Sequence, residues 1–283
     1  MRALSPLLVE PLVRAALLED LGRAGDVTSD TVVPADRRAT VALVAREAGV
    51  VAGTDLAVAA FGLVDRRTEV AVLHPDGTRV SAGDVVARVT GPARGILTAE
   101  RVALNFLGHL SGVATATAQI ADAVAGTGTR VTCTRKTTPG LRAVEKHAVL
   151  AGGGVNHRFG LDDAVLIKDN HIALAGGVRA AVAAARAGVG HLVKIEIEVD
   201  TLDQLREVLT DPVDAVLLDN MTPEQLREAV ALVGGRMVTE ASGRLTAATA
   251  PAVAASGVDL MSAGRITHSA PVLDIGLDVL DLV

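Results

Sequence analysis

Cationic side chains gather between residues 134 and 171 of this 283-residue chain. The chain contains only four lysines among its 27 basic residues, and three of the four lie in this stretch. Because arginine is the usual cation here, each lysine needs a reason, and an ammonium on a flexible stem suits phosphate as a point charge. The stretch also contains Arg135 and Arg158, and arginine binds a carboxylate through two parallel hydrogen bonds. These residue types predict a site for phosphate or carboxylate groups.

The elements that must position these cations alternate between strand and helix beyond residue 129. Short apolar runs rich in β-branched residues predict strands at 130–136, 164–168, 193–199, 214–219, 236–240 and 258–262. Amphipathic helices are predicted between them at 140–151, 176–187, 201–209, 222–233 and 246–256. This alternation favours parallel strands with helical crossovers, and six such units indicate a complete or partial β/α barrel. In such barrels the chemistry lies at the carboxyl ends of the strands.

The ends of the predicted strands differ in charge along the chain. The first two strands end in cations, the next two in carboxylates and the last two in Ser/Gly turns: Arg135-Lys136, Lys168-Asp169, Glu196 and Glu198, Asp219-Asn220, Glu240 to Ser242-Gly243, and Ser262 to Gly264. If the first two strands are neighbours, five cationic side chains converge on one rim: Arg135, Lys136, His157, Arg158 and Lys168. Each one alone is better explained as a solvated loop residue or as part of a surface ion pair. Five on one rim of a chain with a net charge of -6 favour an anion site.

Carboxylates at the ends of the middle strands are suited to hold Mg²⁺. Oxygen ligands from Glu198 and Asp219, completed by water and substrate phosphates, fit this ion. Strand alternation places Glu196 on the same face as Glu198, so the pattern does not decide which of the two points into the site. The alternative is that these carboxylates only balance the neighbouring lysines.

Small residues at the ends of the last two strands are typical of phosphate-binding turns. Ser242 and Gly243 precede the helix predicted from residue 246, and Gly264 follows the last strand. Backbone N–H groups approach a phosphate closely at such turns, and a helix N-terminus adds a favourable dipole. The loops after the last two strands of a β/α barrel are a frequent phosphate site.

Composition excludes several classes of partner. With no tryptophan or tyrosine and three phenylalanines, the chain lacks the aromatic platforms on which single-stranded nucleic acid stacks. The net charge of -6 gives no overall field for a polyanion, so no nucleic-acid partner is expected. No apolar run is long enough to cross a membrane. The single cysteine, Cys133, forbids an intrachain disulfide and fits a reducing compartment, so we expect a cytoplasmic protein.

The first hundred residues are predicted to form a smaller α/β module. A helix at 7–21 precedes strands at 39–46 and 69–73 and short strands over 77–89. A long helix begins at Thr98, where apolar residues recur every three or four positions. The boundary between the two modules is expected within this helix or just before it.

Other polar residues carry no predicted chemistry. Arg142, Glu145 and Lys146 are expected on a solvated helix face. His157 and His171 lack the spacing of a zinc site. No serine, histidine and acid arrangement indicates acyl transfer.

Several motifs together resemble the quinolinate phosphoribosyltransferase family over nearly the whole chain. They are GDVTSD at 25–30, LTAERVALNFLGHLSG at 97–112, TRKTTPGLRAVEKHAVLAGGGVNHR at 134–158, LIKDNH at 166–171, EIEVD at 196–200, LLDN at 217–220, ASG at 241–243 and THS at 267–269. The resemblance implies an N-terminal α/β sandwich domain over 1–108 and an open, incomplete β/α barrel over 109–269, with the tail 270–283 packing back onto the first domain. It also implies a homodimer, with higher assembly left open, in which the partner's N-terminal domain completes each active site.

The family's activity is that of a pentosyltransferase of NAD biosynthesis. The resemblance implies transfer of the phosphoribosyl group of phosphoribosyl pyrophosphate to quinolinate with loss of CO₂, giving nicotinate mononucleotide and pyrophosphate, with Mg²⁺ as cofactor. The pyridine nitrogen would attack C1 of the ribose as pyrophosphate leaves. The positive ring nitrogen would then stabilise the carbanion that remains at C2 when CO₂ departs. No protein nucleophile is needed, in agreement with the missing triad.

The family's site residues carry over to matching positions of this chain. Arg135, His157 and Arg158 would contact the quinolinate carboxylates, with Arg101 reaching in from the other subunit. The remaining positions are two lysines between the substrates, two Mg²⁺ carboxylates and three residues of the phosphate turns: Lys136 and Lys168, Glu198 and Asp219, and Ser242, Gly243 and Gly264. The resemblance thereby favours Glu198 over Glu196. Lys146 is left as a surface residue.

Two residues depart from the family's pattern beside the phosphate turns. Arg244 stands where a small or amide residue is common, and Arg265 stands where alanine is usual. Our hypothesis is that these arginines add phosphate affinity or pair with nearby acids and leave the reaction unchanged.

Three other functions remain open at this level. One is a related protein of the same fold that acts on another aromatic acid, although all the cations for a dicarboxylate are present. A second is a Schiff-base aldolase that uses Lys168 at a strand end. The third is a non-catalytic protein that binds phosphoribosyl pyrophosphate, which would not need Arg101 together with Arg135, His157 and Arg158.

Overall fold

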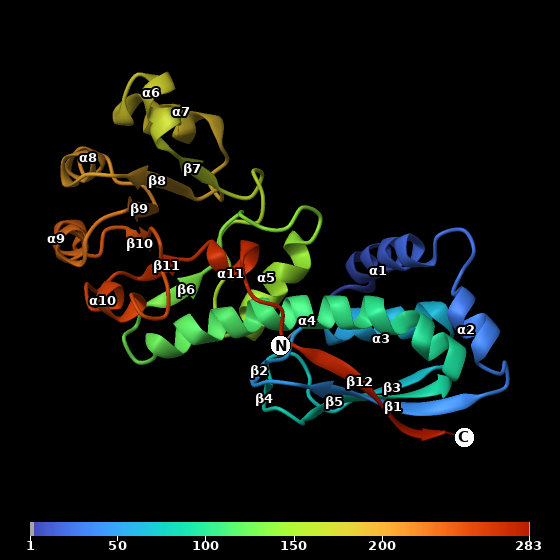
Figure 1. Ribbon diagram of the computed structural model, residues 1–283. Helices are drawn as coiled ribbons and strands as arrows, with labels where there is room; N and C mark the ends of the chain where they lie inside the picture. Colours follow the sequence, from blue (N-terminus) through green and yellow to red (C-terminus); the bar gives the residue numbers. More distant parts are fainter. Residues whose placement is uncertain (1–2, 283) are drawn as a thin grey trace. The chain divides into compact units, whose positions relative to one another are not determined.

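Six short strands in the second half of the chain form one parallel sheet. The computed structural model, which describes residues 3–282, places them at β6 (Arg130–Thr132), β7 (Val165–Ile167), β8 (Ile195–Val199), β9 (Ala215–Asp219), β10 (Val238–Ser242) and β11 (Leu260–Ser262). Their order in the sheet is β6-β11-β10-β9-β8-β7 (Figure 1). Because β6 and β7 form the two edges, the β/α barrel is open between them. The open barrel was predicted, but the expectation that the first two strands are neighbours was wrong.

Helices follow the strands and cover the outer face of the sheet. They are α6 (Asp169–Ala175), α7 (Val178–Gly188), α8 (Leu202–Val208), α9 (Pro223–Val233), α10 (Ala250–Ala254) and α11 (Arg265–His268). The hydroxyls of Thr201 and Thr222 begin α8 and α9 by accepting the N–H groups of Gln204 and Gln225. This capping satisfies N–H groups that have no partner within the helix.

Alternation along each strand separates core from site. On β8, Ile195, Ile197 and Val199 are buried in the cluster that joins the sheet to its helices. Glu196 and Glu198 lie between them in the sequence and therefore point to the opposite, inner face. The same alternation on β10 (Val238–Ser242) places Ala241 in this cluster, with Glu240 and Ser242 on the inner face.

An antiparallel sheet with helices forms the first unit of the chain. The sheet has the order β12-β1-β5-β3, with a separate β2–β4 pair. Its strands are β1 (Arg38–Ala45), β2 (Gly49–Val50), β3 (Glu69–Val72), β4 (Arg79–Val80), β5 (Val85–Pro92) and β12 (Ile275–Leu282), and its helices include α1 (Pro6–Leu21), α2 (Val27–Val32), α3 (Thr54–Val64) and α4 (Ala93–Ala123). This is the α/β sandwich that was predicted. Of the helices between residues 3 and 282, none combines the length and the apolar composition needed to cross a membrane.

The division of the chain differs from the predicted boundaries. The first unit comprises Met1–Ala118, Thr138–Gly153 and Ser269–Val283, and the second comprises Gln119–Thr137 and Gly154–His268. The segment 138–153 was expected in the barrel, but its helix α5 (Arg142–Ala151) packs on α4 of the first unit. The close approach depends on Gly152, because a Cβ there would lie 2.7 Å from the Cβ of Thr117. In the C-terminal tail, β12 pairs antiparallel with β1.

The charged face of α5 is buried, contrary to the expectation of a solvated face. Glu145 is fully buried and Lys146 is 3% exposed. The Glu145 carboxylate lies 2.9 Å from Nε2 of His109 on α4 and accepts the N–H of Thr138 at 3.1 Å. Helical spacing alone did not reveal that this polar face has polar partners in the first unit.

The contact between α4 and the C-terminal tail gives a test of packing in the first unit. A Cβ added at Gly112 in the middle of α4 would overlap the carbonyl of Pro271 and lie 3.2 Å from Cα of Val272. We expect Gly112→Ala to lower the free energy of unfolding by about 1–3 kcal/mol, the usual cost of overpacking. Gly62 on α3 has open space where a Cβ would stand, so it is the matched control. Gly62→Ala should instead stabilise by about 0.5–1 kcal/mol. Denaturant unfolding of both variants measures the difference, and equal effects would contradict the tight contact.

Candidate active site

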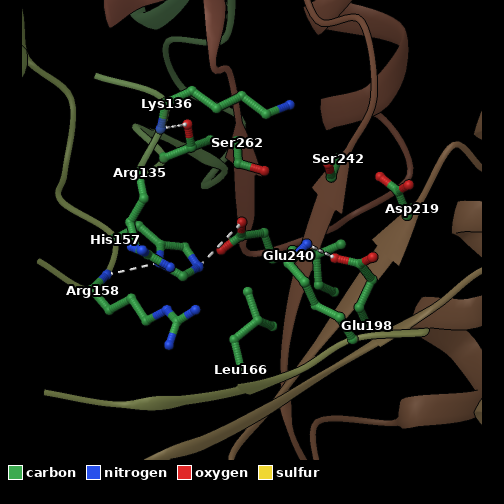
Figure 2. A pocket seen from close by; sticks show the side chains of 13 residues that line it. Arg135, Lys136, His157, Arg158, Leu166, Glu198, Asp219, Glu240, Ser242 and Ser262 are labelled. Atoms are coloured by element: carbon green, nitrogen blue, oxygen red, sulfur yellow. Dashed lines mark hydrogen bonds and ion pairs between the residues drawn. The ribbon is translucent and has the colours of Figure 1, made fainter. Parts of the chain in front are cut away.

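A cavity of about 370 Å³ opens at the carboxyl ends of the parallel strands in the second unit. Its lining combines cations, carboxylates, hydroxyls and two leucines (Figure 2): Thr134, Arg135, Lys136, His157, Arg158, Leu166, Lys168, Glu198, Leu217, Asp219, Glu240, Ser242 and Ser262. All five side chains predicted to converge line this cavity, although β6 and β7 are opposite edges of the sheet. The curvature of the open barrel brings the two edges to one cavity.

Arginines form one side of this cavity. Arg135 follows β6, and Arg158 lies in the segment that leads to β7, on the same side of Figure 2 as His157. Burial lowers the pKa of the Arg158 guanidinium, and the neighbouring Arg135 charge lowers it further. One Arg158 nitrogen donates to the Ala164 carbonyl at 3.0 Å, whereas its buried Nε has no hydrogen-bond partner among residues 3–282. Two guanidiniums held this close are stabilised when an anion binds between them.

His157 has a defined tautomer in this structure. Its Nδ1 accepts the backbone N–H of Arg158 at 2.8 Å, so the hydrogen belongs on Nε2. Nε2 lies 2.9 Å from Oε2 of Glu196, to which it donates. The imidazole is therefore neutral, and its direct donation to a substrate carboxylate would require exchange of the Glu196 contact. The expectation that His157 adds a cation to the rim does not fit this geometry.

Carboxylates form the opposite side of the cavity. Glu198 accepts a hydrogen bond from the ammonium of Lys168 at 2.6 Å. Asp219 accepts one from the side-chain amide of Asn220 at 2.6 Å. Glu198 and Asp219 both line the cavity, whereas Glu196, on the same face of β8, lies deeper with His157. Strand alternation did not decide which of the two glutamates points into the site. In the structure Glu198 pairs with Lys168 and Glu196 with His157.

The predicted phosphate turns lie beside the carboxylates. Ser242 and Ser262 line the cavity at the ends of β10 and β11. Gly243 has a φ of +121° and adjoins Asn220, while a Cβ on Gly264 would lie 3.0 Å from Cδ of Lys136. Both glycines therefore allow close approach of the backbone to site residues.

Two residues beside these turns have unusual backbone conformations. Asn220 and Arg244 have φ angles of +54° and +44°, a region that residues other than glycine rarely adopt. The N–H of Asn220 donates to the Ser242 carbonyl at 2.9 Å. This bond and the contact of the Asn220 amide with Asp219 tie the Asp219 carboxylate to the turn at Gly243. Arg265, the other departure from the family pattern, is exposed at the start of α11.

Arg101 lies in the first unit and lines a different pocket, of about 220 Å³. Its neighbours there include Glu19 and Asp20 of α1 and Asn105 and His109 of α4. The Arg101 side chain is 65% exposed, and its contact with Glu100 is long, at 4.0 Å. It is thus an accessible cation.

The sequence prediction missed several lining residues: Leu166, Leu217, Glu240 and Ser262. Each of the first three lies two positions before a predicted site residue on its strand, namely Lys168, Asp219 and Ser242. Alternation would have found them, because residues two apart share a face. Ser262 was identified only as the start of a turn.

Glu240 is the most unusual of the missed residues. It is 2% exposed, and burial together with the Glu196 charge raises its pKa to about 7. Ligand atoms of His157, Glu196 and Glu240 lie within 4.8 Å of one another, a spacing that could also hold a metal ion. The His157 tautomer argues against a metal, because a metal-bound Nε2 would require a hydrogen on Nδ1. The cluster of His157, Glu196 and Glu240 is better suited to share a proton than to hold a metal ion.

The glycine at the first phosphate turn tests the link to Asp219. A Cβ on Gly243 would lie 2.7 Å from Oδ1 of Asn220, in a backbone conformation that disfavours alanine. We expect Gly243→Ala to weaken binding of Mg²⁺-pyrophosphate by about tenfold, or roughly 1.4 kcal/mol. Gly188, at the end of α7, has open space around it and gives the control Gly188→Ala. Titration calorimetry of both variants provides the comparison, and unchanged binding in Gly243→Ala would exclude a role for this turn.

Comparison with known proteins agrees with this geometry. A family model described as the quinolinate phosphoribosyl transferase C-terminal domain matches residues 113–278, and the N-terminal domain model matches residues 26–111. The chain is 45% identical over 272 residues to the nicotinate-nucleotide pyrophosphorylase (carboxylating) of Mycobacterium leprae (strain TN), covering 94% of this chain and 95% of that protein. It is 40% identical over 271 residues to a probable enzyme of the same name from Bacillus subtilis (strain 168), covering 96% and 93%. The crystal structure of NadC from Streptococcus pyogenes matches with a TM-score of 0.94 at 41% identity, covering 99% and 100% of the two chains. The chain therefore belongs to the quinolinate phosphoribosyltransferase family.

Proposed function

We propose that this protein transfers the phosphoribosyl group of phosphoribosyl pyrophosphate to quinolinate with decarboxylation. The products are nicotinate mononucleotide, pyrophosphate and CO₂, which places the reaction in NAD biosynthesis. One observation carries the proposal: a single cavity holds two neighbouring arginines, two lysines and, across from the arginines, two carboxylates. A small aromatic dicarboxylate and a magnesium-bound pyrophosphate need these groups together.

The arginine side of the cavity fits the acceptor. Arg135 and Arg158 would hold the quinolinate carboxylates, since paired guanidiniums match two neighbouring carboxylates in charge and geometry. Leu166 and Leu217 supply apolar surface for the pyridine ring. Holding the ring in this way orients its nitrogen toward C1 of the ribose, and orientation of two substrates is a large part of catalysis.

The carboxylate side fits the phosphoribosyl donor. Glu198 and Asp219 present the oxygen atoms that Mg²⁺ prefers, and substrate phosphates and water would complete its shell. A Mg²⁺ ion held there supplies positive charge for the departing pyrophosphate. Lys136 and Lys168 add positive charge between the substrates, and the hydroxyls of Ser242 and Ser262 are placed to donate to phosphate oxygens.

We also propose a homodimer in which Arg101 of one subunit completes the quinolinate site of the other. The exposed guanidinium of Arg101 in its own pocket supports this, because it is available for an anion. Exposed apolar side chains on α1 and α2 also support an interface: Leu7, Leu8, Leu18, Val27 and Val32. The cytoplasmic location expected from the single cysteine stays a prediction.

The alternative functions fit the structure less well. A Schiff-base lysine must be uncharged to attack a carbonyl, whereas Lys168 lies 2.6 Å from Glu198 as an ion pair. A protein acting on a monocarboxylic acid would have no use for both Arg135 and Arg158. That Arg244 and Arg265 increase the affinity for phosphate stays a hypothesis.

An assay with quinolinate, phosphoribosyl pyrophosphate and Mg²⁺ tests the proposed function. We expect stoichiometric formation of pyridine nucleotide, pyrophosphate and CO₂, with little product when nicotinate replaces quinolinate. Arg158→Lys should raise the KM for quinolinate, since an ammonium cannot replace the fork of a guanidinium, and should leave the KM for phosphoribosyl pyrophosphate nearly unchanged. If quinolinate yields no nucleotide, the proposal is wrong.

Mixing two inactive variants tests the contribution of Arg101 in trans. Arg101→Ala and Glu198→Ala should each be nearly inactive alone. After subunit exchange, each heterodimer would contain one complete site of two, so an equimolar mixture should regain about a quarter of wild-type activity and the purified heterodimer about half. Purification through two different tags establishes that heterodimers have formed. A lack of recovery in verified heterodimers would show that Arg101 does not act across subunits.

A further inference from the structure

The proposed reaction requires a proton that no residue discussed above supplies. When CO₂ leaves, the electron pair of the broken bond stays on C2 of the ring, and the product carries a hydrogen at that carbon. Bonding of that pair to a proton from water or from the protein completes the step. This requirement rests on the proposed function, and a protein donor must lie in the cavity with an available proton.

Three candidate donors on the cavity wall are engaged or turned elsewhere. The hydrogen on Nε2 of His157 is directed at Glu196. The Lys168 ammonium pairs with Glu198 on the phosphate side. The Lys136 ammonium points away from His157 and Arg158, where the quinolinate carboxylates are expected (Figure 2).

Glu240 faces the cavity between the arginine side and the carboxylate side (Figure 2). It lies on β10 and lines the cavity, and Figure 2 places it between His157 and Glu198. Its buried Oε1 has no hydrogen-bond partner within residues 3–282, and Nε2 of His157 is 3.8 Å away. A carboxyl oxygen without a partner is costly to bury as an anion, but it is suited to an O–H that donates when a ligand enters.

Burial and the neighbouring Glu196 favour the protonated form of Glu240. The Glu196 carboxylate approaches from β8, and two carboxylates this close do not both ionise readily. His157 and the hydroxyl of Ser262 on β11 act in the opposite direction and lower the pKa of Glu240, but by less than burial and Glu196 raise it. On β9 the residue in register with Glu240 is Leu217, which carries no charge.

We propose that Glu240 is a buried carboxylic acid that donates the proton to C2 during decarboxylation. In this step the bond from C2 to the carboxylate carbon breaks, and CO₂ leaves. The electron pair on C2 takes the hydrogen of Glu240 Oε1, and Glu240 becomes a carboxylate. Water then returns a proton to Glu240, driven by the adjacent charge of Glu196, and no oxidant or reductant is needed.

Separate measurement of pyrophosphate and CO₂ in a single turnover tests this role. The substrate is quinolinate labelled in its 2-carboxylate, with phosphoribosyl pyrophosphate and Mg²⁺. Glu240→Gln keeps the volume and a neutral side chain but removes the acidic proton. We expect pyrophosphate release at the wild-type rate, CO₂ release slowed by about 100-fold, and accumulation of the mononucleotide that retains both carboxylates.

The pH profile gives a second readout that does not depend on folding of the variant. Burial together with the Glu196 charge raises the pKa of Glu240 to about 7, so the acid form is present below that pH and is lost as the pH rises through it. In the wild-type protein the rate of CO₂ release should therefore fall above about pH 7, while the rate of pyrophosphate release should not follow the same curve. Glu196→Gln removes the neighbouring charge and should move the fall in CO₂ release to lower pH.

A carboxylate at the other end of the same strands provides the matched control. Asp259 precedes β11 and accepts hydrogen bonds from the N–H and hydroxyl of Thr239. Asp259→Asn should leave the ratio of CO₂ to pyrophosphate release unchanged. If Glu240→Gln released CO₂ at the wild-type rate, or lost both products by the same factor, Glu240 would not be the donor. Failure of the wild-type protein to release pyrophosphate would instead refute the proposed function.

Discussion

Parallel pairing of six short strands is the constraint on which the site depends. Because all six strands run in one direction, their carboxyl ends meet at one edge, and the register aligns Asp219 with Ser242 and Ser242 with Ser262. The residues on the outer face of each strand pack against the helices. A shift of the strand register by one residue would expose them to solvent, so the residues on the inner face are held in place as well. The positions of the charged groups thus follow from the burial of residues such as Ile197 and Leu218.

The charges in the cavity are only partly neutralised by one another. Glu198 pairs with Lys168, whereas the guanidiniums of Arg135 and Arg158 adjoin each other, and burial and the Arg135 charge both lower the pKa of Arg158. Such a like-charge pair is unfavourable without an anion, and a bound dicarboxylate relieves the repulsion. Binding energy from the carboxylates is thereby available to orient the ring for attack on the ribose.

Much of the barrel was predictable from the sequence, because short apolar runs that alternate with amphipathic helices are typical of parallel strands. All six strands and five of the helical segments were found, with ends that differ by a few residues. The short helices α6 and α11 were missed, since four to seven residues carry too little periodicity. The break between β6 and β7 was also missed, because sequence order does not say which strands form the edges.

The roles within the site were harder to predict. The burial of Glu145 and Lys146 depends on partners distant in the sequence, and helical spacing contains no information about them. The neutral state of His157 depends on one backbone N–H and on Glu196, which only coordinates reveal. Glu240 was recognised as part of a strand end, but its burial could not be inferred from its neighbours.

A crystal structure with quinolinate, Mg²⁺ and a non-reactive analogue of phosphoribosyl pyrophosphate tests the central claim most directly. The account predicts the two ring carboxylates on Arg135 and Arg158, and the pyrophosphate with its metal beside Glu198 and Asp219. Both ligands should lie in the one cavity at the carboxyl ends of the strands. Quinolinate bound outside this cavity, or a metal held only by His157, Glu196 and Glu240, would contradict it.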